Sequence, residues 1–452
     1  MSNTDTSAPH TPEERAKLAR RAAIASLVGT AVEWYDYFIF GTASALVFGT
    51  LFFPNPDDPI IGTLSAFAVF GVGFVARPLG AVVFGHFGDK VGRKVALITT
   101  LMLMGTSTFL IGLLPTAEQI GMWAAALLVL LRLAQGFAVG GEWGGASLVA
   151  VEYAPDDKRG AYGSFPQIGN AVGLVFSTAI FAIVSLLPEE QLFSWGWRVP
   201  FLLSAVLIVV GLFIRFKLTE TPSFQAAQAQ LESEQQAAQA KEKMPLAELF
   251  RSFKKPLLLA MGMRFGEAVF GYIVLTIGLT YVENYTDMPR THVLIASSVA
   301  AGVAVYTYYF FGKYSDRIGR RTVFMFGSVF GAAVAFPFFW ALEAENIILM
   351  YVVYVLAYGI GVGAVYGVEP AFFSELFGTK VRYTGVSLAA QIPSILVGFW
   401  PFLATALFAA TDGDPWPIAA LTAVSLVIGL VCAYLAPETN RSDINDIREE
   451  AR

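Results

Sequence analysis

The stretch "EWYDYF" places two carboxylates, Glu33 and Asp36, inside a run that is otherwise apolar from Ala22 to Phe48. The two acids are three residues apart, so on a helix they share one face. No lysine or arginine lies within ten residues of either acid, and any neutralising partner must come from another segment. Burial and mutual repulsion favour the protonated form of a carboxylate. The pair therefore indicates a site that gains and loses a proton.

Further ionisable residues interrupt other apolar segments: Arg77, Arg132, Glu142, Arg264, Glu267 and Glu369. Such residues cost about 2.5–3.5 kcal/mol each inside a membrane and mark function by default. Acids outnumber bases in the combined set, so we expect at least one acid to hold a proton. Three buried arginines suit an anionic substrate. Arg264 and Glu267 share a helix face, and two interpretations stay open: the arginine contacts substrate, or the two form a structural pair.

The elements that carry these residues are membrane-spanning helices. Hydrophobic residues make up 56% of the 452 residues and charged residues only 14%, whereas soluble proteins carry about 25% charged residues. A spanning helix needs roughly 17–25 mainly apolar residues. Twelve such stretches begin near Ala22, Gly62, Val95, Gly121, Tyr162, Trp197, Pro256, His292, Thr322, Asn346, Tyr383 and Trp416. Polar residues interrupt the fourth and the tenth, and Glu369, just before a proline, predicts a break in the tenth helix.

Lysine and arginine gather on one side of the predicted membrane. Both tails and alternate loops hold most of the 30 basic residues, and the other side has only Arg198 and Arg290. Because basic loops stay in the cytoplasm, we expect a multi-pass protein of the cell (inner) membrane with both termini cytoplasmic. The expected parts are a cytoplasmic tail (1–21), a six-helix bundle (22–216), a cytoplasmic linker (217–255), a second six-helix bundle (256–436) and a cytoplasmic tail (437–452).

The two halves of the sequence repeat each other. "GHFGDKVGRK" (85–94) follows the second span and returns as "GKYSDRIGRR" (312–321) after the eighth. Likewise Glu152 and Arg159 are seven apart after the fourth span, as are Glu375 and Arg382 after the tenth. Two similar halves joined by a polar linker favour a transporter that rocks one bundle against the other around a midplane site.

These repeated elements resemble the major facilitator superfamily, and within it the metabolite:proton symporter family, of the shikimate permease type. The resemblance covers nearly the whole chain and is carried by "EWYDYFIFG" (33–41), "FVARPLGAVVFGHFGDKVGRK" (74–94), "LRLAQGFAVGGEWGGA" (131–146), "YGSFPQIG" (162–169), "WGWRVPFLLS" (195–204) and "ELFGTKVRYTGVS" (375–387). It implies an all-α major facilitator fold of twelve transmembrane helices in two six-helix bundles. It also implies a central cavity that opens alternately to each side, and proton-driven uptake.

The resemblance also implies a cytoplasmic gate at the repeated loops, which holds while the cavity faces outward. The gate residues are Asp89, Arg93, Glu152 and Arg159 in the first half and Asp316, Arg320, Glu375 and Arg382 in the second. The alternative is that these charges only follow the basic bias of the cytoplasmic side.

For proton coupling we expect Asp36, Glu33, Arg132 and Glu142. Arg132 in "RLAQG" resembles the superfamily's fourth-span arginine, and the leading hypothesis pairs it with Asp36, with Arg77 as the rival partner. A fixed salt bridge that only fastens helices is the alternative. The expected substrate-binding residues are Arg77, Tyr35, Gln135, Trp143, Gln167, Arg264, Glu267, Tyr272 and Gln391, although ordinary helix packing also explains the polar and aromatic ones.

The favoured function is import of a small organic acid such as shikimate or a related carboxylate. The alternative is import of a zwitterionic compatible solute of the proline/betaine type, since that branch of the family shares the same motifs. No nucleophile–base pair or ligand cluster indicates an enzyme, a metal or a cofactor, and the only cysteine, Cys432, forms no internal disulfide. The expected partners are the substrate, protons and the lipid bilayer, with no nucleic acid, and the expected state is a monomer.

Overall fold

The computed structural model describes residues 12–55, 57–91, 93–140, 143–152, 154–217, 245–378 and 381–441. Within these ranges all secondary structure is helical. Eleven of the described stretches are long and apolar enough to cross a membrane. The remaining span is α4 (Arg93–Leu113), whose apolar part is the shorter segment Ile98–Leu113. The predicted all-α fold of twelve spans is therefore confirmed.

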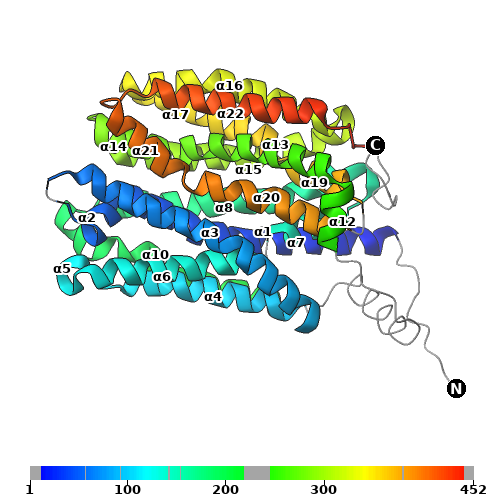
Figure 1. The fold of residues 1–452 in the computed structure, drawn as a ribbon, viewed down its shortest axis with the longest axis horizontal. Helices are drawn as coiled ribbons and strands as arrows, with labels where there is room; N and C mark the ends of the chain where they lie inside the picture. The colour runs from blue at the N-terminus through cyan, green and yellow to red at the C-terminus, as the bar shows by residue number, and fades with distance from the viewer. Residues whose placement is uncertain are drawn as a thin grey trace.

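The first half of the chain forms the lower part of Figure 1, in blue and cyan. Its spanning helices are α1 (Pro12–Ala43), α3 (Pro59–Val91), α4, α6 (Met122–Val139), α8 (Arg159–Val184) and α10 (Arg198–Lys217). Shorter helices join them: η1 (Ser44–Phe48), α2 (Gly49–Phe52), α5 (Ala117–Ile120), α7 (Trp143–Glu152), η2 (Asp156–Lys158), α9 (Glu189–Gln191) and η3 (Leu192–Gly196).

The second half forms the upper part, in green to red. It begins with α12 (Pro245–Ser252), and its seventh span joins α13 (Lys254–Tyr272), η4 (Ile273–Ile277) and α14 (Gly278–Tyr285). Next come α15 (Arg290–Ile318) and α16 (Arg320–Glu343). The tenth span joins α17 (Ile347–Tyr354), η5 (Val355–Val362), α18 (Gly363–Tyr366) and α19 (Glu369–Leu376), and the last helices are α20 (Arg382–Gly398), α21 (Trp400–Ala410) and α22 (Trp416–Leu435).

The tenth span breaks where the sequence predicts it. After the π-helical segment η5, the chain leaves α18 at Gly367 and resumes as α19 at Glu369, with Pro370 in the first turn. A proline fits the first turn because the N–H it lacks would have no helical partner there. The break fixes the place of the Glu369 carboxylate in the middle of the protein.

Helices α8 and α15 pack side by side and join the two halves, and α3 packs along α20. Helix α1 begins, and α22 ends, at the right side of Figure 1. We call this side of the bundle the terminal end and the other side the opposite end.

Glycines bring α3 and α6 unusually close. A Cβ atom on Gly136 would lie only 1.8 Å from the carbonyl oxygen of Gly73. A Cβ on Gly73 would in turn lie 2.6 Å from Nε of Arg132. Small residues at membrane helix contacts allow such close approach. They let the Arg132 side chain lie across α3, where it meets the aromatic face of α1.

Candidate functional site

Arg132 is buried on α6 and is held by polar and aromatic groups. Its Nε donates to the Phe70 carbonyl oxygen at 3.3 Å, and its Nη1 donates to Oε1 of Gln135 at 3.2 Å. The guanidinium carbon lies 4.3 Å from the ring centre of Phe40 and 5.4 Å from that of Tyr37. Arginine is favourable over ring faces because the π cloud attracts its charge.

The structure does not bring Asp36 into an ion pair with Arg132 or with Arg77, in contrast to the leading hypothesis and its rival. Asp36 is buried on α1 near the Thr108 side chain of α4, and its Oδ1 has no hydrogen-bond partner among the described residues. The Thr108 hydroxyl oxygen accepts a hydrogen bond from Nε2 of Gln135 at 2.7 Å, and Gln135 holds Arg132. Two polar side chains therefore stand between the carboxylate and the guanidinium, while Glu33 is buried on the same helix.

A small cavity, here called the arginine pocket, lies beside this group of residues. It is lined by Tyr37, Gly73, Arg77, Met104, Arg132, Gln135, Gly136 and Val139. The guanidinium carbon of Arg77 lies 4.1 Å from the ring centre of Phe74 and 5.2 Å from that of Tyr37. Neither arginine of the pocket forms an ion pair with a carboxylate among the described residues, and Nε of Arg77 and the Tyr37 hydroxyl are buried without a hydrogen-bond partner there. The pocket thus concentrates positive charge and unused donors.

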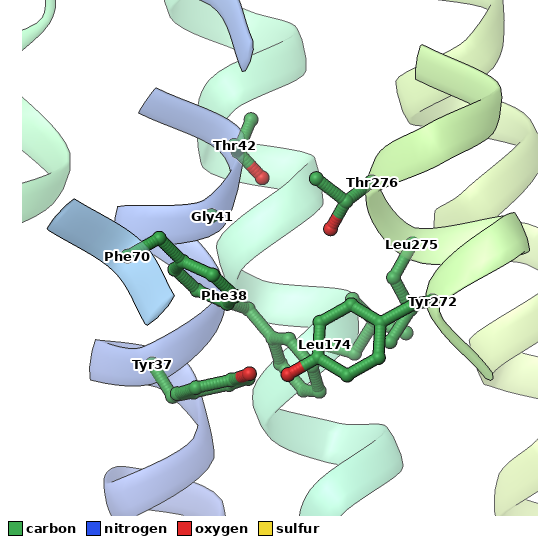
Figure 2. A pocket seen from close by; sticks show the side chains of 9 residues that line it. All are labelled: Tyr37, Phe38, Gly41, Thr42, Phe70, Leu174, Tyr272, Leu275 and Thr276. Carbon is green, nitrogen blue, oxygen red and sulfur yellow. The ribbon is translucent and has the colours of Figure 1, made fainter. Parts of the chain in front are cut away.

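A second cavity, here called the hydroxyl pocket, lies between the halves and shares Tyr37 with the first. Its lining comes from α1, α3, α8, α13 and η4: Tyr37, Phe38, Gly41, Thr42, Phe70, Leu174, Tyr272, Leu275 and Thr276. Figure 2 shows the hydroxyls of Tyr37 and Tyr272 pointing toward one another, with the Thr42 and Thr276 side chains farther along. Hydroxyls and aromatic faces together are typical of a site for a polar ring.

The second half contributes a charged cluster of one base and two acids. Nη1 of Arg264 donates to Oε2 of Glu267 at 2.7 Å and to Oε2 of Glu369 at 2.9 Å. All three are buried, and the guanidinium carbon lies 5.1 Å from the ring centre of Tyr366. Of the two open interpretations, the structure contains the Arg264–Glu267 pair, extended by the Glu369 carboxylate at the break in the tenth span.

Several predicted substrate-binding residues lie away from both pockets. The Tyr35 hydroxyl donates to the Pro200 carbonyl oxygen at 2.7 Å, because Tyr35 is on the face of α1 that packs against α10. Nε2 of Gln167 donates to the Tyr366 carbonyl oxygen at 3.3 Å and joins the two halves, and Gln391 is buried on α20. Glu142 and the Trp143 side chain lie outside the described part of the structure.

Sequence reasoning overlooked Tyr37, which lines both pockets. Its signal was available, because Tyr37 is four residues after Glu33 and four before Gly41, and helical residues with that spacing share a face. Tyr35, only two residues away, points elsewhere for the same reason.

At the terminal end, Asp316, Arg320 and Glu375 form a compact group, here called the gate cluster. Nη1 of Arg320 donates to Oδ1 of Asp316 at 2.7 Å, while its Nε and Nη2 each donate to a Glu375 oxygen at 3.1 Å. The Asp316 carboxylate also accepts from the backbone N–H groups of Gly160 and Ala161 at 2.8 and 3.1 Å, across the two halves. An acid at a helix N-terminus is favourable because the helix dipole is positive there.

The other predicted gate residues lie around this cluster. Arg159 pairs with Asp156 and approaches Glu375 at 3.9 Å, and Arg382 contacts Glu152 at 3.5 Å. The side chains of Asp89 and Arg93 lie outside the described part of the structure. The contacts of these two residues, which correspond to Asp316 and Arg320 in the second half, are therefore not described.

Polar contacts also join the halves toward the opposite end. The Tyr358 hydroxyl donates to Oδ1 of Asn170 at 3.1 Å, and the hydroxyls of Thr178 and Ser298 lie 2.6 Å apart. The cavities between these contacts and the gate cluster are small, with volumes of about 10 Å³ each, near the lower limit for a single water molecule. This conformation is closed around both pockets, and the halves must separate before a metabolite-sized ligand fits.

Comparisons with known proteins agree with this architecture. The family model described as "Sugar (and other) transporter" matches residues 22–451. The chain is 41% identical to the shikimate transporter of Escherichia coli over 426 residues, covering 94% of this chain and 96% of the relative. It is 34% identical to the proline/betaine transporter of Salmonella typhimurium over 443 residues, covering 95% of this chain and 88% of the relative.

Among solved structures, the fold is similar to that of a proton:xylose symporter of the major facilitator superfamily bound to a bromo-deoxyglucose. The TM-score is 0.72 at 15% identity, covering 96% of this chain and 98% of that one. A partially occluded inward-open conformation of the xylose transporter from E. coli matches with a TM-score of 0.71 at 15% identity, covering 94% of this chain and 100% of that one.

Proposed function

The chain belongs to the Sugar (and other) transporter family of the major facilitator superfamily, and from this premise we propose that it is a proton-coupled symporter importing a small hydroxylated organic acid of the shikimate type. The bundles 22–216 and 256–436 rock against each other, and the substrate occupies the arginine and hydroxyl pockets once they widen. The protein is not an enzyme: its relatives are transporters that move a solute through a multi-pass membrane fold.

The observation that carries this proposal is the junction of the two pockets at Tyr37. On one side, Arg77 and Arg132 form no ion pair with a carboxylate among the described residues, which suits a substrate carboxylate because guanidinium groups match its geometry. On the other side, Tyr37 and Tyr272 contribute hydroxyls, and two threonines extend the polar lining. A ring with a carboxylate at one end and hydroxyls at the other fits this arrangement of charge and polarity.

Asp36 is the proposed proton carrier. It is buried, and among the described residues its Oδ1 has no hydrogen-bond partner and no arginine pairs with it. A proton on Asp36 removes a negative charge near the two arginines, which leaves them free for the substrate anion. One proton carried with a singly charged anion makes the transported complex neutral. Only a further proton gives the complex a net charge on which the membrane potential acts. One further charge moving through 100 mV is worth about 2.3 kcal/mol, or roughly fifty-fold accumulation.

The terminal end is the proposed cytoplasmic side of a bacterial inner membrane. The reason is the concentration of lysine and arginine in the tails and in the loops on that side, which the positive-inside rule places in the cytoplasm. In that orientation the gate cluster closes the inner side.

Import of a zwitterionic solute is the second candidate, and the charge distribution is its specific support. The two arginines lie in the first half, while the Arg264 cluster in the second half has two acids for one base. A carboxylate bound at the arginines and an ammonium group bound at Glu267 or Glu369 would use both. The relatives at 34% identity are named for proline and betaine.

Counterflow in proteoliposomes separates these candidates. Vesicles loaded with shikimate, with a cyclohexene carboxylate that lacks hydroxyls, with proline or with glycine betaine are tested for exchange of each labelled solute. We expect exchange of the hydroxylated acid, weaker exchange of the unhydroxylated one and none of betaine. Betaine exchange without acid exchange supports the second candidate and contradicts the first.

Coupling is measured in the same vesicles with the substrate found by counterflow. Uptake should rise as the outside is made more acidic than the inside, and collapse when an ionophore removes both gradients. Asp36→Asn, which cannot release a proton, should keep exchange but lose the response to the pH gradient. Undiminished pH-driven accumulation by this variant would remove Asp36 from the mechanism.

A further inference from the structure

The Arg264 cluster contains more acids than its arginine can neutralise. Nη1 of Arg264 donates to Oε2 of Glu267 at 2.7 Å and to Oε2 of Glu369 at 2.9 Å. Two ionised acids and one base would leave these three side chains with a net charge of −1. Neither carboxylate pairs with a second base among the described residues. The surplus charge would lie in the protein interior, because the three residues are at most 7% exposed.

Burial makes that surplus charge unfavourable. A carboxylate without a compensating partner is far less stable in a low-dielectric interior than the neutral acid. Two carboxylates that share one donor also repel each other, and such a pair binds and releases its protons as a unit. One bound proton removes the surplus, because a single ionised acid then remains opposite the arginine. The geometry of the cluster therefore predicts that its two acids hold one proton between them.

Glu369 is the better place for this proton. Its side chain is fully buried and its Oε1 has no hydrogen-bond partner among the described residues, whereas Glu267 keeps an exposure of 5%. Glu369 is also the first residue of α19, and a helix N-terminus favours the ionised form of an acid. That effect is the smaller one, since burial of an uncompensated charge costs more than one helix terminus returns. With the proton on Oε1, Oε2 stays an acceptor for Arg264.

The cluster keeps its contacts when the halves move. Both of its hydrogen bonds join residues of the second half, Arg264 and Glu267 on α13 and Glu369 on α19. The gate cluster is different, because Asp316 reaches across to backbone groups of the first half. A rocking motion that separates the halves breaks the bonds of Asp316 to the first half but neither of the two bonds to Arg264. The acids therefore face the same arginine throughout transport.

We propose that Glu267 and Glu369 share one resident proton, held on Glu369, which neutralises the Arg264 cluster and is not transported. The proposal rests on the proposed proton-coupled function and divides the buried acids into two kinds. Asp36 exchanges a proton in each transport cycle, and Glu369 keeps its proton. The cluster consequently adds no charge to the transported complex.

Other titratable groups surround the cluster without neutralising it. Those within electrostatic reach of it are Tyr366 on α18, Tyr308 on α15, Tyr358 on η5, and Tyr37 and Arg77 of the first half. None of these forms an ion pair with Glu267 or Glu369 among the described residues. Helices α7, α8, α16 and α20 also pack against α19. Their charged groups there are Glu152, Arg159, Arg320 and Arg382, which lie around Glu375 at the other end of α19.

Two single variants and their double variant test the shared proton. Neither acid lines the arginine pocket or the hydroxyl pocket. Glu369→Gln replaces a neutral acid by a neutral amide, and Glu267→Gln leaves Glu369 to ionise opposite Arg264. Each single variant keeps a neutral cluster, so its yield in membranes and its equal-pH counterflow of labelled shikimate should stay within about threefold of the parent protein.

The double variant leaves Arg264 without either carboxylate. Its yield in membranes should fall more than about tenfold, because removing the partner of a buried charge is strongly destabilising. This loss exceeds the product of the two single effects, as expected when either acid alone can neutralise the arginine. Large losses in both single variants that multiply in the double variant would overturn the proposal, because both acids would then be needed in ionised form.

Infrared spectroscopy of the purified protein gives a readout that a packing role would not change. A protonated carboxylic acid has a C=O band separate from the bands of ionised carboxylates. At neutral pH we expect a component of this band to disappear in Glu369→Gln and also in Glu267→Gln, because the cluster loses its proton in both. Glu190→Gln removes an exposed acid of α9 and is the matched control that should keep the band. An unchanged band in both cluster variants would contradict the resident proton.

Accumulation of shikimate driven by a pH gradient separates this proposal from the proposed function. Glu369→Gln should accumulate shikimate to within about twofold of the parent protein and keep its pH profile, whereas Asp36→Asn should lose the response. If Glu369→Gln also loses the response, Glu369 releases its proton during transport, so the resident proton is wrong and proton coupling stands. If Asp36→Asn keeps full coupling, the proposed role of Asp36 fails, and the infrared band still decides whether the cluster holds a proton.

Discussion

The carboxylate of Asp316 on α15 caps the first turn of α8 in the other half of the chain, where Oδ1 accepts the backbone N–H of Gly160 at 2.8 Å. The same oxygen accepts from Nη1 of Arg320. A single side chain therefore joins a helix terminus of one half to the gate cluster of the other. When the halves separate at the terminal end, these hydrogen bonds must break.

Asp316→Asn should weaken this closure. An amide keeps the size of the carboxylate but loses its charge, and charge-assisted bonds at a helix N-terminus contribute about 1–2 kcal/mol in partly buried positions. We expect the terminal end to open roughly five- to tenfold more often. The measurement is the rate of thiol labelling at Ser164→Cys, on the buried contact between α8 and α15, after Cys432 is replaced by serine.

The control for this experiment is Asp157→Asn. Asp157 lies exposed in the turn before α8, and its side chain forms no ion pair or hydrogen bond with the residues that the structure describes. Its replacement should leave the labelling rate unchanged. Equal rates for the two amide variants would mean that Asp316 does not hold the halves together.

Arg320→Lys should destabilise the protein although it keeps the charge. The guanidinium makes two parallel bonds to Glu375 and another to Asp316, and an ammonium group cannot reproduce that fork. Losing one bond between charged groups costs about 1.5–3 kcal/mol. Thermal unfolding in detergent should show a lower midpoint for Arg320→Lys, whereas Arg317→Lys at an exposed position should match the parent protein. A midpoint unchanged in both variants would contradict the role of the fork.

In the Arg264 cluster, we expect replacement of the base to be far more damaging to transport than replacement of one of its acids. Arg264→Gln leaves Glu267 and Glu369 facing each other in the protein interior, which should cost about 3–5 kcal/mol and abolish membrane insertion or transport. Glu369→Gln keeps an oxygen that accepts from Arg264 and leaves a neutral pair, so transport should stay within about threefold. The two variants are compared by expression in membranes and by counterflow. If Glu369→Gln is the more damaging change, this carboxylate takes part in transport directly.

Tyr37→Phe should weaken binding of a hydroxylated acid without harming the fold. The missing hydroxyl is one that both pockets share, and a hydrogen bond to a neutral group is worth about 0.5–1.5 kcal/mol, or roughly two- to tenfold in KM. An analogue without ring hydroxyls should show no such change. Tyr35→Phe provides the contrast, since it loses the bond to Pro200 and should lower the unfolding midpoint but not the affinity. If Tyr35→Phe lowers the affinity and Tyr37→Phe lowers only the unfolding midpoint, Tyr35 contacts the substrate and Tyr37 supports the fold.

The fold was largely predictable because its main signals are local. The twelve apolar stretches, the repeated loops and the proline after Glu369 all depend on composition or short spacing. The α4 span falls short of spanning length within the residues whose side chains are described, yet it begins where the sequence places it.

The site was predictable only in its residue types. Acids and arginines inside apolar segments indicate a buried polar centre. The partners of these residues, however, come from helices far away in sequence. Nothing in "EWYDYF" indicates that Thr108, in another span, would take the place beside Asp36 that we expected an arginine to fill. Spacing places Tyr37, and not Tyr35, on the helix face of Glu33 and Gly41, but tertiary packing decides which face of α1 lines the pockets and which meets α10.

The short segment after α22 also takes part in closing the protein. Glu438 accepts the backbone N–H groups of Arg320 and Arg321 at 2.8 and 3.2 Å, and the Thr439 hydroxyl donates to Glu375 at 2.7 Å. The segment that follows the last membrane-spanning helix is thus bonded to the gate cluster, which closes the cytoplasmic side in the proposed mechanism. A purification tag or fluorescent fusion joined directly after Leu435 would displace this segment. Such tags should therefore be placed beyond residue 441 or at another site.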